Sequence, residues 1–129
     1  MRMAARPVRM AQVKRSKYRA VKETVDGITF ASKAEARRYG ELRLLERSGA
    51  LQGLEVQPVF LLWANSFPLG SAESVSVPVG QYIADFRYYT PDGELVIEDV
   101  KSKPTRTAVY RLKKRIVEVQ YGITIREIR

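Results

Sequence analysis

The stretch Gln81–Lys101 reads QYIADFRYYT, then PDG, then ELVIEDVK, which is two strand-like segments joined by a short turn. Pro91-Asp92-Gly93 suits a type I turn followed by a left-handed glycine, a common connection between antiparallel strands. This turn predicts that Thr90 pairs with Glu94, and the pairing sets the register of the whole hairpin.

That register brings charged side chains together. It places Asp85 directly opposite Asp99, and like charges at opposed positions destabilise a sheet. A divalent cation is the simplest compensation. The alternation of side chains puts Lys101 on the same face as Asp99 and sends Glu98 to the other face. An ordinary Asp–Lys ion pair accounts for one of the two acids but not for both, so this pattern predicts a site that hydrolyses phosphodiesters.

The composition excludes several kinds of site. The chain has 129 residues, of which 45% are hydrophobic, so we expect one globular domain. It contains no cysteine and no histidine, which excludes disulfides, thiolate metal sites, histidine-bound zinc and catalysis by a histidine base. The absence of cysteine fits a reducing cytoplasm. The longest apolar run, residues 59–64, is too short to span a membrane, so we expect no membrane partner.

The positive charge is concentrated at the start of the chain. The net charge is +9, and residues 1–22 hold eight lysines or arginines and no acid. We therefore expect residues 1–16 to form a flexible basic arm and residues 17–129 to form the domain. Lys14, Arg15 and Lys17 are candidates for contacts to DNA phosphates. The alternative is a tail that only improves solubility.

A second basic segment follows the acidic pair. Residues 101–115 hold seven cations and no acid, and residues 105–121 are predicted to form a helix. Its apolar stripe is expected to pack on the sheet; the residues are Val109, Leu112, Ile116 and Val119. The other side, together with Lys103, is a candidate nucleic-acid surface or an ordinary solvated face; its residues are Arg106, Tyr110 and Lys114.

The remaining elements complete an α/β fold. We expect a leading hairpin over residues 17–30, which turns at Asp26-Gly27, and a helix over residues 32–48 that ends at Gly49. Further strands are expected over residues 54–64 and 123–128, with Pro58 at an edge or a bulge and residues 65–78 as a loop or flap. The last strand should lie parallel to residues 94–101 after a helical crossover. The prediction is a central mixed sheet flanked by helices.

Glu35 has two interpretations. Ser32-Lys33-Ala34-Glu35 is a capping box, in which Glu35 only reaches back to the start of its helix. Alternatively, Glu35 is a third acid of the site, because it shares a helix face with Tyr39 and Leu42, which should turn toward the sheet. A carboxylate aimed at a core is costly unless it is paired or bound to metal, which favours the second interpretation.

These residues resemble a known family. Asp85 followed by Asp99-Val100-Lys101, with Glu35 on a preceding helix, resembles the signature of the PD-(D/E)xK nuclease superfamily, which includes restriction endonucleases and Holliday-junction resolvases. Short motifs across residues 17–129 are also similar to a small phage- and prophage-associated family of unknown function. One departure is Ala84, where the superfamily name expects proline. The resemblance implies a restriction-endonuclease-like αβββαβ core.

The resemblance also implies roles for individual residues. Asp85 and Asp99 would bind Mg²⁺ or Mn²⁺, with help from the Val100 carbonyl and Glu35. Lys101 would orient the attacking water and offset charge on the phosphate. Gln57 would support the site from a neighbouring strand, although a simple strand-end hydrogen bond is the favoured alternative.

Two functions remain open from the sequence. The leading hypothesis is a Mg²⁺-dependent DNA endonuclease, phage or prophage encoded and acting in the cytoplasm of a bacterial host, with branched DNA as one substrate option and a homodimer as one assembly option. The alternative is a non-catalytic nucleic-acid-binding protein on the same fold, in which the basic arm does the binding.

Overall fold

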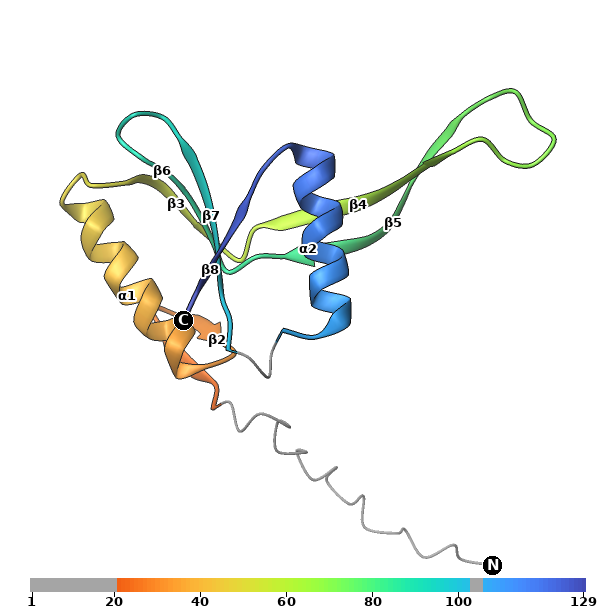
Figure 1. Cartoon of the computed structure of the whole chain (residues 1–129). Coiled ribbons are helices and arrows are strands. Elements are labelled where there is room, and N and C mark those ends of the chain that lie inside the picture. Colours follow the sequence, from red (N-terminus) through yellow and green to blue (C-terminus); the bar gives the residue numbers. More distant parts are fainter. Residues whose placement is uncertain (1–20, 103–105) are drawn as a thin grey trace, which may run out of the picture.

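The computed structural model describes residues 21–102 and 106–129, and it shows an α/β fold with two helices (Figure 1). The helices are α1 (Lys33–Arg47) and α2 (Ala108–Tyr121). The strands are β1 (Glu23–Val25), β2 (Ile28–Phe30), β3 (Gln52–Val56), β4 (Val59–Ser66), β5 (Val75–Ile83), β6 (Phe86–Tyr89), β7 (Leu95–Val100) and β8 (Ile125–Ile128). None of the helices in this part of the chain is long and apolar enough to cross a membrane.

The central sheet has four strands in the order β3-β6-β7-β8. β6 runs antiparallel to both β3 and β7, whereas β7 and β8 are parallel, as expected for strands joined by a helical crossover. The sheet is therefore mixed, and the predicted α/β class with a leading hairpin is confirmed.

Apolar side chains cover both faces of the sheet. On one face, Phe86, Tyr88 and Val96 pack with residues of α1. On the other, Ile97 and Ile125 pack with α2 and with the β4–β5 pair. The alternation of β7 therefore turns even-numbered side chains toward α1 and odd-numbered ones toward α2.

The turn between β6 and β7 has the predicted form. Gly93 has a φ of 84°, and the Thr90 amide donates to the Glu94 carbonyl at 2.9 Å. Glycine adopts this left-handed conformation without the steric cost of a Cβ atom. The ladder then pairs Tyr89 with Leu95 and, at its other end, Phe86 with Glu98, so the predicted register is confirmed for these pairs.

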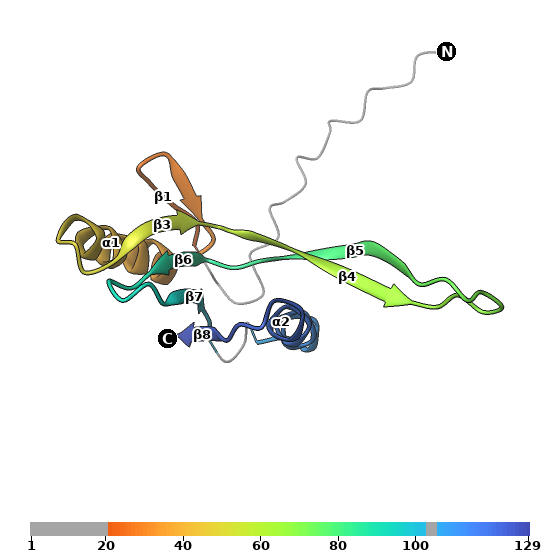
Figure 2. The same ribbon diagram turned by 90° about the horizontal axis from the view of Figure 1, so that it is seen from above.

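Two strands predicted as continuous are broken. Gln57 has a φ of 55°, which ends β3 just before Pro58, and a second break at Ala84–Asp85 separates β5 from β6. At these two points β4 and β5 leave the central sheet and pair with each other as a ribbon (Figure 2). The predicted loop over residues 65–78 was therefore too long, because β4 reaches Ser66 and β5 begins at Val75.

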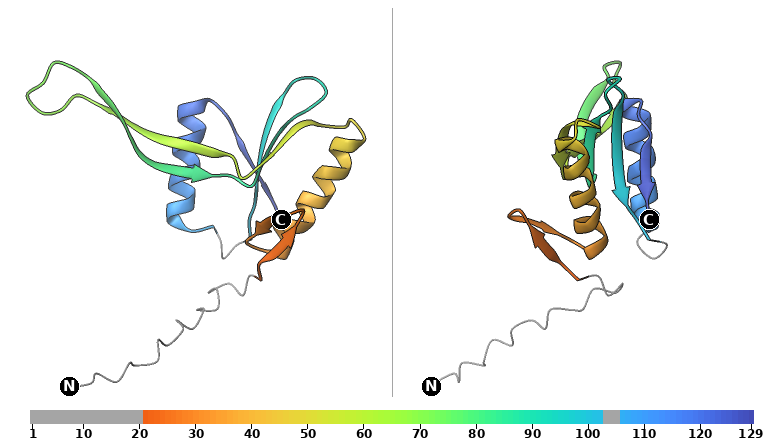
Figure 3. Two further views of the ribbon diagram at one scale, coloured as in Figure 1. Left: turned by 180° about the vertical axis from the view of Figure 1, so that it is seen from behind. Right: turned by 90° about the vertical axis from the view of Figure 1, so that its left-hand side faces the viewer.

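The leading hairpin turns where the sequence predicts. Asp26 and Gly27 both have positive φ, at 52° and 75°, as in a type I′ turn. The Tyr39 hydroxyl donates to the Asp26 carboxylate at 2.7 Å, which ties the turn to α1. The β1–β2 hairpin projects beside the first turn of α1 (Figure 3).

Both helices end at residues that stop helices well. Ser32 caps α1, and Gly49 follows its C-terminus with a φ of 83°. Thr107 caps α2, and Gly122 ends it in the left-handed conformation. The second helix therefore begins a few residues later than predicted.

The prediction for the apolar face of α2 was wrong for three of its four residues. Val109, Leu112 and Val119 are 62%, 62% and 64% exposed. Ile116 is partly buried and packs against the core, as predicted. The opposite side packs instead, through Tyr110 and Val117. Lys114, a partly buried cation on that side, lies 3.3 Å from Glu118 of α2 and 4.0 Å from Glu127 of β8, which offsets the cost of its burial.

Candidate functional site

Asp99 is the most unusual side chain of the central sheet. It lies in β7 and is 1% exposed, and neither carboxylate oxygen has a hydrogen-bond partner among the described residues. Its pKa is raised to about 7, mainly by burial and in smaller part by the charge of Glu35, while Lys101 opposes the rise. The Asp85 amide also helps to hold this pKa down, although its geometry falls short of a hydrogen bond to either oxygen. A buried carboxylate without partners is costly.

Asp85 lies next to Asp99 but just outside the paired strand. The ladder between β6 and β7 stops at Phe86, so Asp85 is not a ladder partner of Asp99. Its Oδ2 atom instead accepts the Val100 amide at 2.6 Å, and no described residue donates to Oδ1. Burial raises the pKa of Asp85, while the Val100 amide and Lys101 lower it. The predicted face-to-face pair is therefore not a ladder pair, and Asp85 instead holds the backbone directly after Asp99.

Glu35 fits both interpretations made from the sequence, as a helix cap and as an acid near the candidate site. Its amide donates to the Ser32 hydroxyl at 3.2 Å, and its Oε2 atom accepts the Ala31 amide at 3.3 Å, so it takes part in capping α1. Burial, followed by the charge of Asp85, raises its pKa to about 7. Glu35 therefore caps the helix and is also close enough to the candidate site for the charge of Asp85 to raise its pKa.

Lys101 follows β7 and supplies the positive charge. Its amide donates to the Ile128 carbonyl at 2.8 Å, which fixes the backbone beside β8. Its Nζ atom lies 4.6 Å from the centre of the Tyr110 ring, a cation–π contact. Lys101 lowers the pKa of Asp85, Asp99 and Glu35, so its ammonium is close enough to interact electrostatically with all three acids.

The acids are not clustered as a ready-made cage. Within residues 21–102 and 106–129, no group of three or more acidic side chains is close enough to hold a metal ion. Magnesium does not require such a group, because it keeps several waters and binds through one or two carboxylates. The two unpartnered oxygens of Asp99 and the half-buried carboxylate of Asp85 fit that simpler kind of site.

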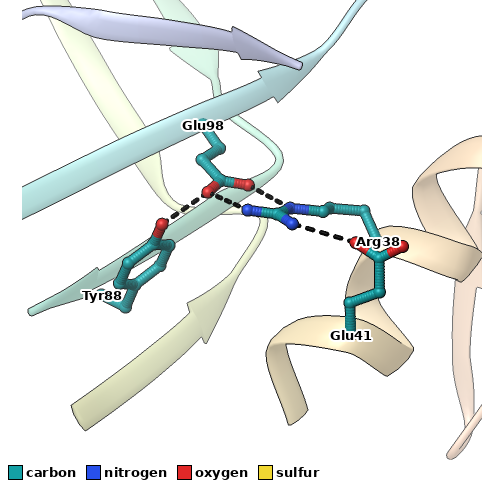
Figure 4. Close-up of polar contacts among 4 residues, drawn as sticks. All are labelled: Arg38, Glu41, Tyr88 and Glu98. Atoms are coloured by element: carbon teal, nitrogen blue, oxygen red, sulfur yellow. Dashed lines mark hydrogen bonds and ion pairs between the residues drawn. The ribbon is translucent and has the colours of Figure 1, made fainter. Parts of the chain in front are cut away.

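Glu98 lies on the opposite face, as the register predicts, and is fully buried. Arg38 of α1 donates from Nε and Nη2 to its two oxygens at 2.8 and 2.7 Å, and the Tyr88 hydroxyl donates to Oε2 at 2.5 Å (Figure 4). Arg38 also contacts Glu41 at 2.9 Å. This bidentate pair joins α1 to β7, and α1 carries Glu35 while β7 carries Asp99.

The other predicted site residues do not gather here. The Gln57 side chain donates to the Thr29 carbonyl at 3.3 Å, which matches the strand-end alternative and not a supporting role in the site. Arg106 pairs with Glu127 at 2.8 Å, and Lys114 pairs with Glu118 at 3.3 Å. Within the predicted stripe, Tyr110 is buried and Lys114 is partly buried, whereas Arg106 stays exposed, and contact of this stripe with a nucleic acid stays a prediction. The predictions for Lys14, Arg15, Lys17 and Lys103 lie outside the described residues.

The residues that contact β7 on the face of the sheet opposite Asp99 were not predicted from the sequence. Arg38 and Tyr88 were not identified, although a lone glutamate in an otherwise apolar strand is a signal that a buried cation must face it. Tyr110 was placed on the wrong face. Helical spacing shows which residues share a face but not which face is buried, so no pattern in the sequence locates Tyr110 beside Lys101.

Neither the curated proteins nor the solved structures include a match to this chain. A family model described as "Protein of unknown function (DUF1064)" matches residues 15–127. Because this match covers most of the 129 residues, the chain belongs to the DUF1064 family.

Proposed function

We propose that this protein is a metal-dependent endonuclease that hydrolyses phosphodiester bonds of DNA. The comparisons name no nuclease, so the proposal rests on the site and on the resemblance to PD-(D/E)xK enzymes. Its main support is Asp99, a buried acid whose two oxygens have no partner among the described residues and which lies in the field of Lys101. A purely structural role does not explain why a folded chain would keep that acid.

The donor set fits a hard divalent cation such as Mg²⁺ or Mn²⁺. Asp99 and Asp85 would hold it, with oxygens of water and of the Val100 carbonyl completing the shell and Glu35 nearby. When bound, the cation would lower the pKa of a coordinated water and stabilise negative charge on the phosphate. It would also offset the repulsion between neighbouring acids, which adds to burial in raising the pKa of Asp99 and Glu35.

The side chains of the protein have separate tasks in this proposal. Lys101 orients the attacking water and offsets charge on the phosphate oxygens. Tyr110 holds the lysine ammonium in place through the ring contact of 4.6 Å. The Asp85–Val100 hydrogen bond fixes the end of β7, so that Asp99 and Lys101 keep their spacing. Arg38 and Glu98 hold α1, and with it Glu35, against the same strand.

The test is a cleavage assay with purified protein. Linear duplex, single-stranded and four-way-junction DNA are incubated with and without Mg²⁺, and products are separated on a denaturing gel. We expect cleavage that depends on Mg²⁺ and that is lost in Asp85→Ala, Asp99→Ala and Lys101→Ala. The matched control is Glu94→Ala, which removes an exposed acid at the turn before the same strand. Cleavage that survives Asp99→Ala, or that Glu94→Ala removes equally, contradicts the proposal.

A further inference from the structure

A cavity lies directly beside Lys101, between the end of β5 and the first turn of α2. Its volume is about 440 Å³. Sites that bind small organic molecules commonly have about 300–1,000 Å³, so one nucleotide fits in a space of this size. Tyr110, whose ring contacts the Lys101 ammonium, also lines the cavity, and Glu35 is not one of its lining residues.

One side of this cavity is positively charged. Lys101 and Lys113 both line it, as does Thr107, the N-cap of α2. The first turn of α2 contains no acid, so the positive end of the helix dipole is not neutralised there. Backbone amides at a helix N-terminus and two ammonium groups together favour a phosphate.

The other side is aromatic and apolar. Tyr82 and Tyr110 line the cavity with their rings 6.3 Å apart, and Ile83 and Val109 add aliphatic surface. Both tyrosines are more than nine-tenths buried, and their hydroxyls have no hydrogen-bond partner among the described residues. Because both hydroxyl oxygens are themselves covered, this side of the cavity offers a nucleobase aromatic and aliphatic surface and not an open phenol.

The edge of β5 adds backbone groups to the same space. The Ala84 amide donates to the Pro58 carbonyl, and Tyr82 is the next even-numbered residue, paired with Phe60. Antiparallel pairing then points the amide and carbonyl of Gln81 and Ile83 away from β4, toward the free edge of the ribbon. Both residues line the cavity, so the edge of a base would meet unpaired backbone groups there.

We infer that this cavity, which we name the β5–α2 pocket, binds one nucleotide of the substrate strand that has left the base stack beside the cleaved bond. Its phosphate lies at Lys113 and the start of α2, and its base lies against the tyrosine side. This inference rests on the proposed nuclease function and narrows it. The substrate class is DNA with an unpaired nucleotide next to the cut, because a paired base must first be unstacked at a cost.

The test is binding without cleavage, in EDTA, so that it does not depend on catalysis. Fluorescence anisotropy compares three duplexes of equal length: fully paired, with one unpaired thymidine, and with an abasic residue at the unpaired position. Wild-type protein should bind the thymidine duplex at least about fivefold more tightly than the other two, which is the lower end of one base-stacking contact. Equal binding of the three duplexes overturns the inference, whether or not the protein cleaves DNA.

Two variants separate the pocket from general affinity for DNA. Val109→Trp should fill the pocket and abolish the preference for the unpaired thymidine. Its matched control is Val119→Trp on the same helix, since Val109 and Val119 are 62% and 64% exposed and Val119 does not line the pocket. Circular dichroism checks that both variants are folded. A preference that persists in Val109→Trp, or that is lost equally in Val119→Trp, contradicts the assignment.

Discussion

Glu98 and Asp99 are consecutive residues of β7, and both are almost completely buried. Only the carboxylate of Glu98 has hydrogen-bond partners among the described residues. Alternation along the strand turns Glu98 to Arg38 and Tyr88 and turns Asp99 to the side of Lys101. The first acid stabilises the fold, because its charge is paired. The second carries a cost that the fold does not relieve, which is why function is proposed for it.

Asp99→Asn should separate activity from stability. The amide keeps the shape of the side chain but removes the negative charge, so Mg²⁺-dependent cleavage should fall by at least about 100-fold. Above pH 7 the variant should be as stable as wild type or more stable, by roughly 1–2 kcal/mol, because a buried charge has been removed. Cleavage assays and urea unfolding measure the two effects. An inactive variant that is also strongly destabilised would point to a structural role instead.

Bound metal should be visible without any measurement of activity. At pH 8, millimolar Mg²⁺ should raise the melting temperature of wild type by a few degrees, because a ligand that binds only the folded state stabilises it. The same addition should have no effect on Asp99→Asn. Calorimetric scans with and without EDTA check this. An equal rise in both proteins would indicate that the ion binds elsewhere.

Glu98→Gln should destabilise the protein although the residue lies on the far side of the strand from Asp99. Removing the buried partner leaves Arg38 with only the exposed Glu41, and the cost should be about 2–4 kcal/mol. Urea unfolding measures it, with Glu94→Gln as the exposed control. The double variant Arg38→Met with Glu98→Gln should recover part of the loss. A neutral Glu98→Gln would show that the Arg38 contact contributes little.

Stability should fall as the pH rises when no divalent ion is present. The pKa values of Asp99 and Glu35 are raised from 3.8 and 4.5 to about 7, so the folded state binds more protons than the unfolded state between pH 4 and 7. The contribution of these two groups to the free energy of unfolding is therefore greatest below pH 4.5. It has been lost once the pH passes 7, and the loss is on the order of 2–4 kcal/mol. Melting curves in EDTA from pH 4.5 to 8 should show this slope, and Asp99→Asn should flatten it.

Lys101→Gln should abolish cleavage without preventing folding. Lys101 is half-buried and lowers the pKa of three acids, so its loss should also make the pH slope of stability steeper. Arg115→Gln removes an exposed cation of α2 and serves as the control. Cleavage rates and melting curves are compared for both variants. Undiminished cleavage in Lys101→Gln would remove this lysine from the mechanism.

Deletion of residues 1–16 should separate the nuclease from a simple DNA-binding protein. For the nuclease we expect metal-dependent cleavage at low salt to remain, while affinity and its salt dependence decrease. A protein that binds DNA only through its basic arm should lose most of its affinity. Gel-shift titrations at two salt concentrations, run beside the cleavage assay, distinguish the two outcomes.

Local chemistry was sufficient to predict the hairpin that carries the site. Pro91-Asp92-Gly93 closes the turn through neighbouring backbone groups, and the register follows from it by counting, so the opposite faces of Glu98 and Asp99 could be predicted without coordinates. The helix ends at Gly49 and Gly122 follow from the same kind of short-range rule, because glycine tolerates the left-handed conformation found there.

Long-range contacts were needed for everything that joins one element to another. Helical spacing identifies two faces of α2, but the acids at Glu118 and Glu127 and the ring of Tyr82 select the face that packs. The ion-pair partner of Glu98 is Arg38, 60 residues away, and no local pattern in the sequence indicates it. Periodicity in the sequence shows which side chains share a face of one helix or strand. Which face is buried depends on the free energy of its contacts with other helices and strands, and these contacts exist only once the chain has folded.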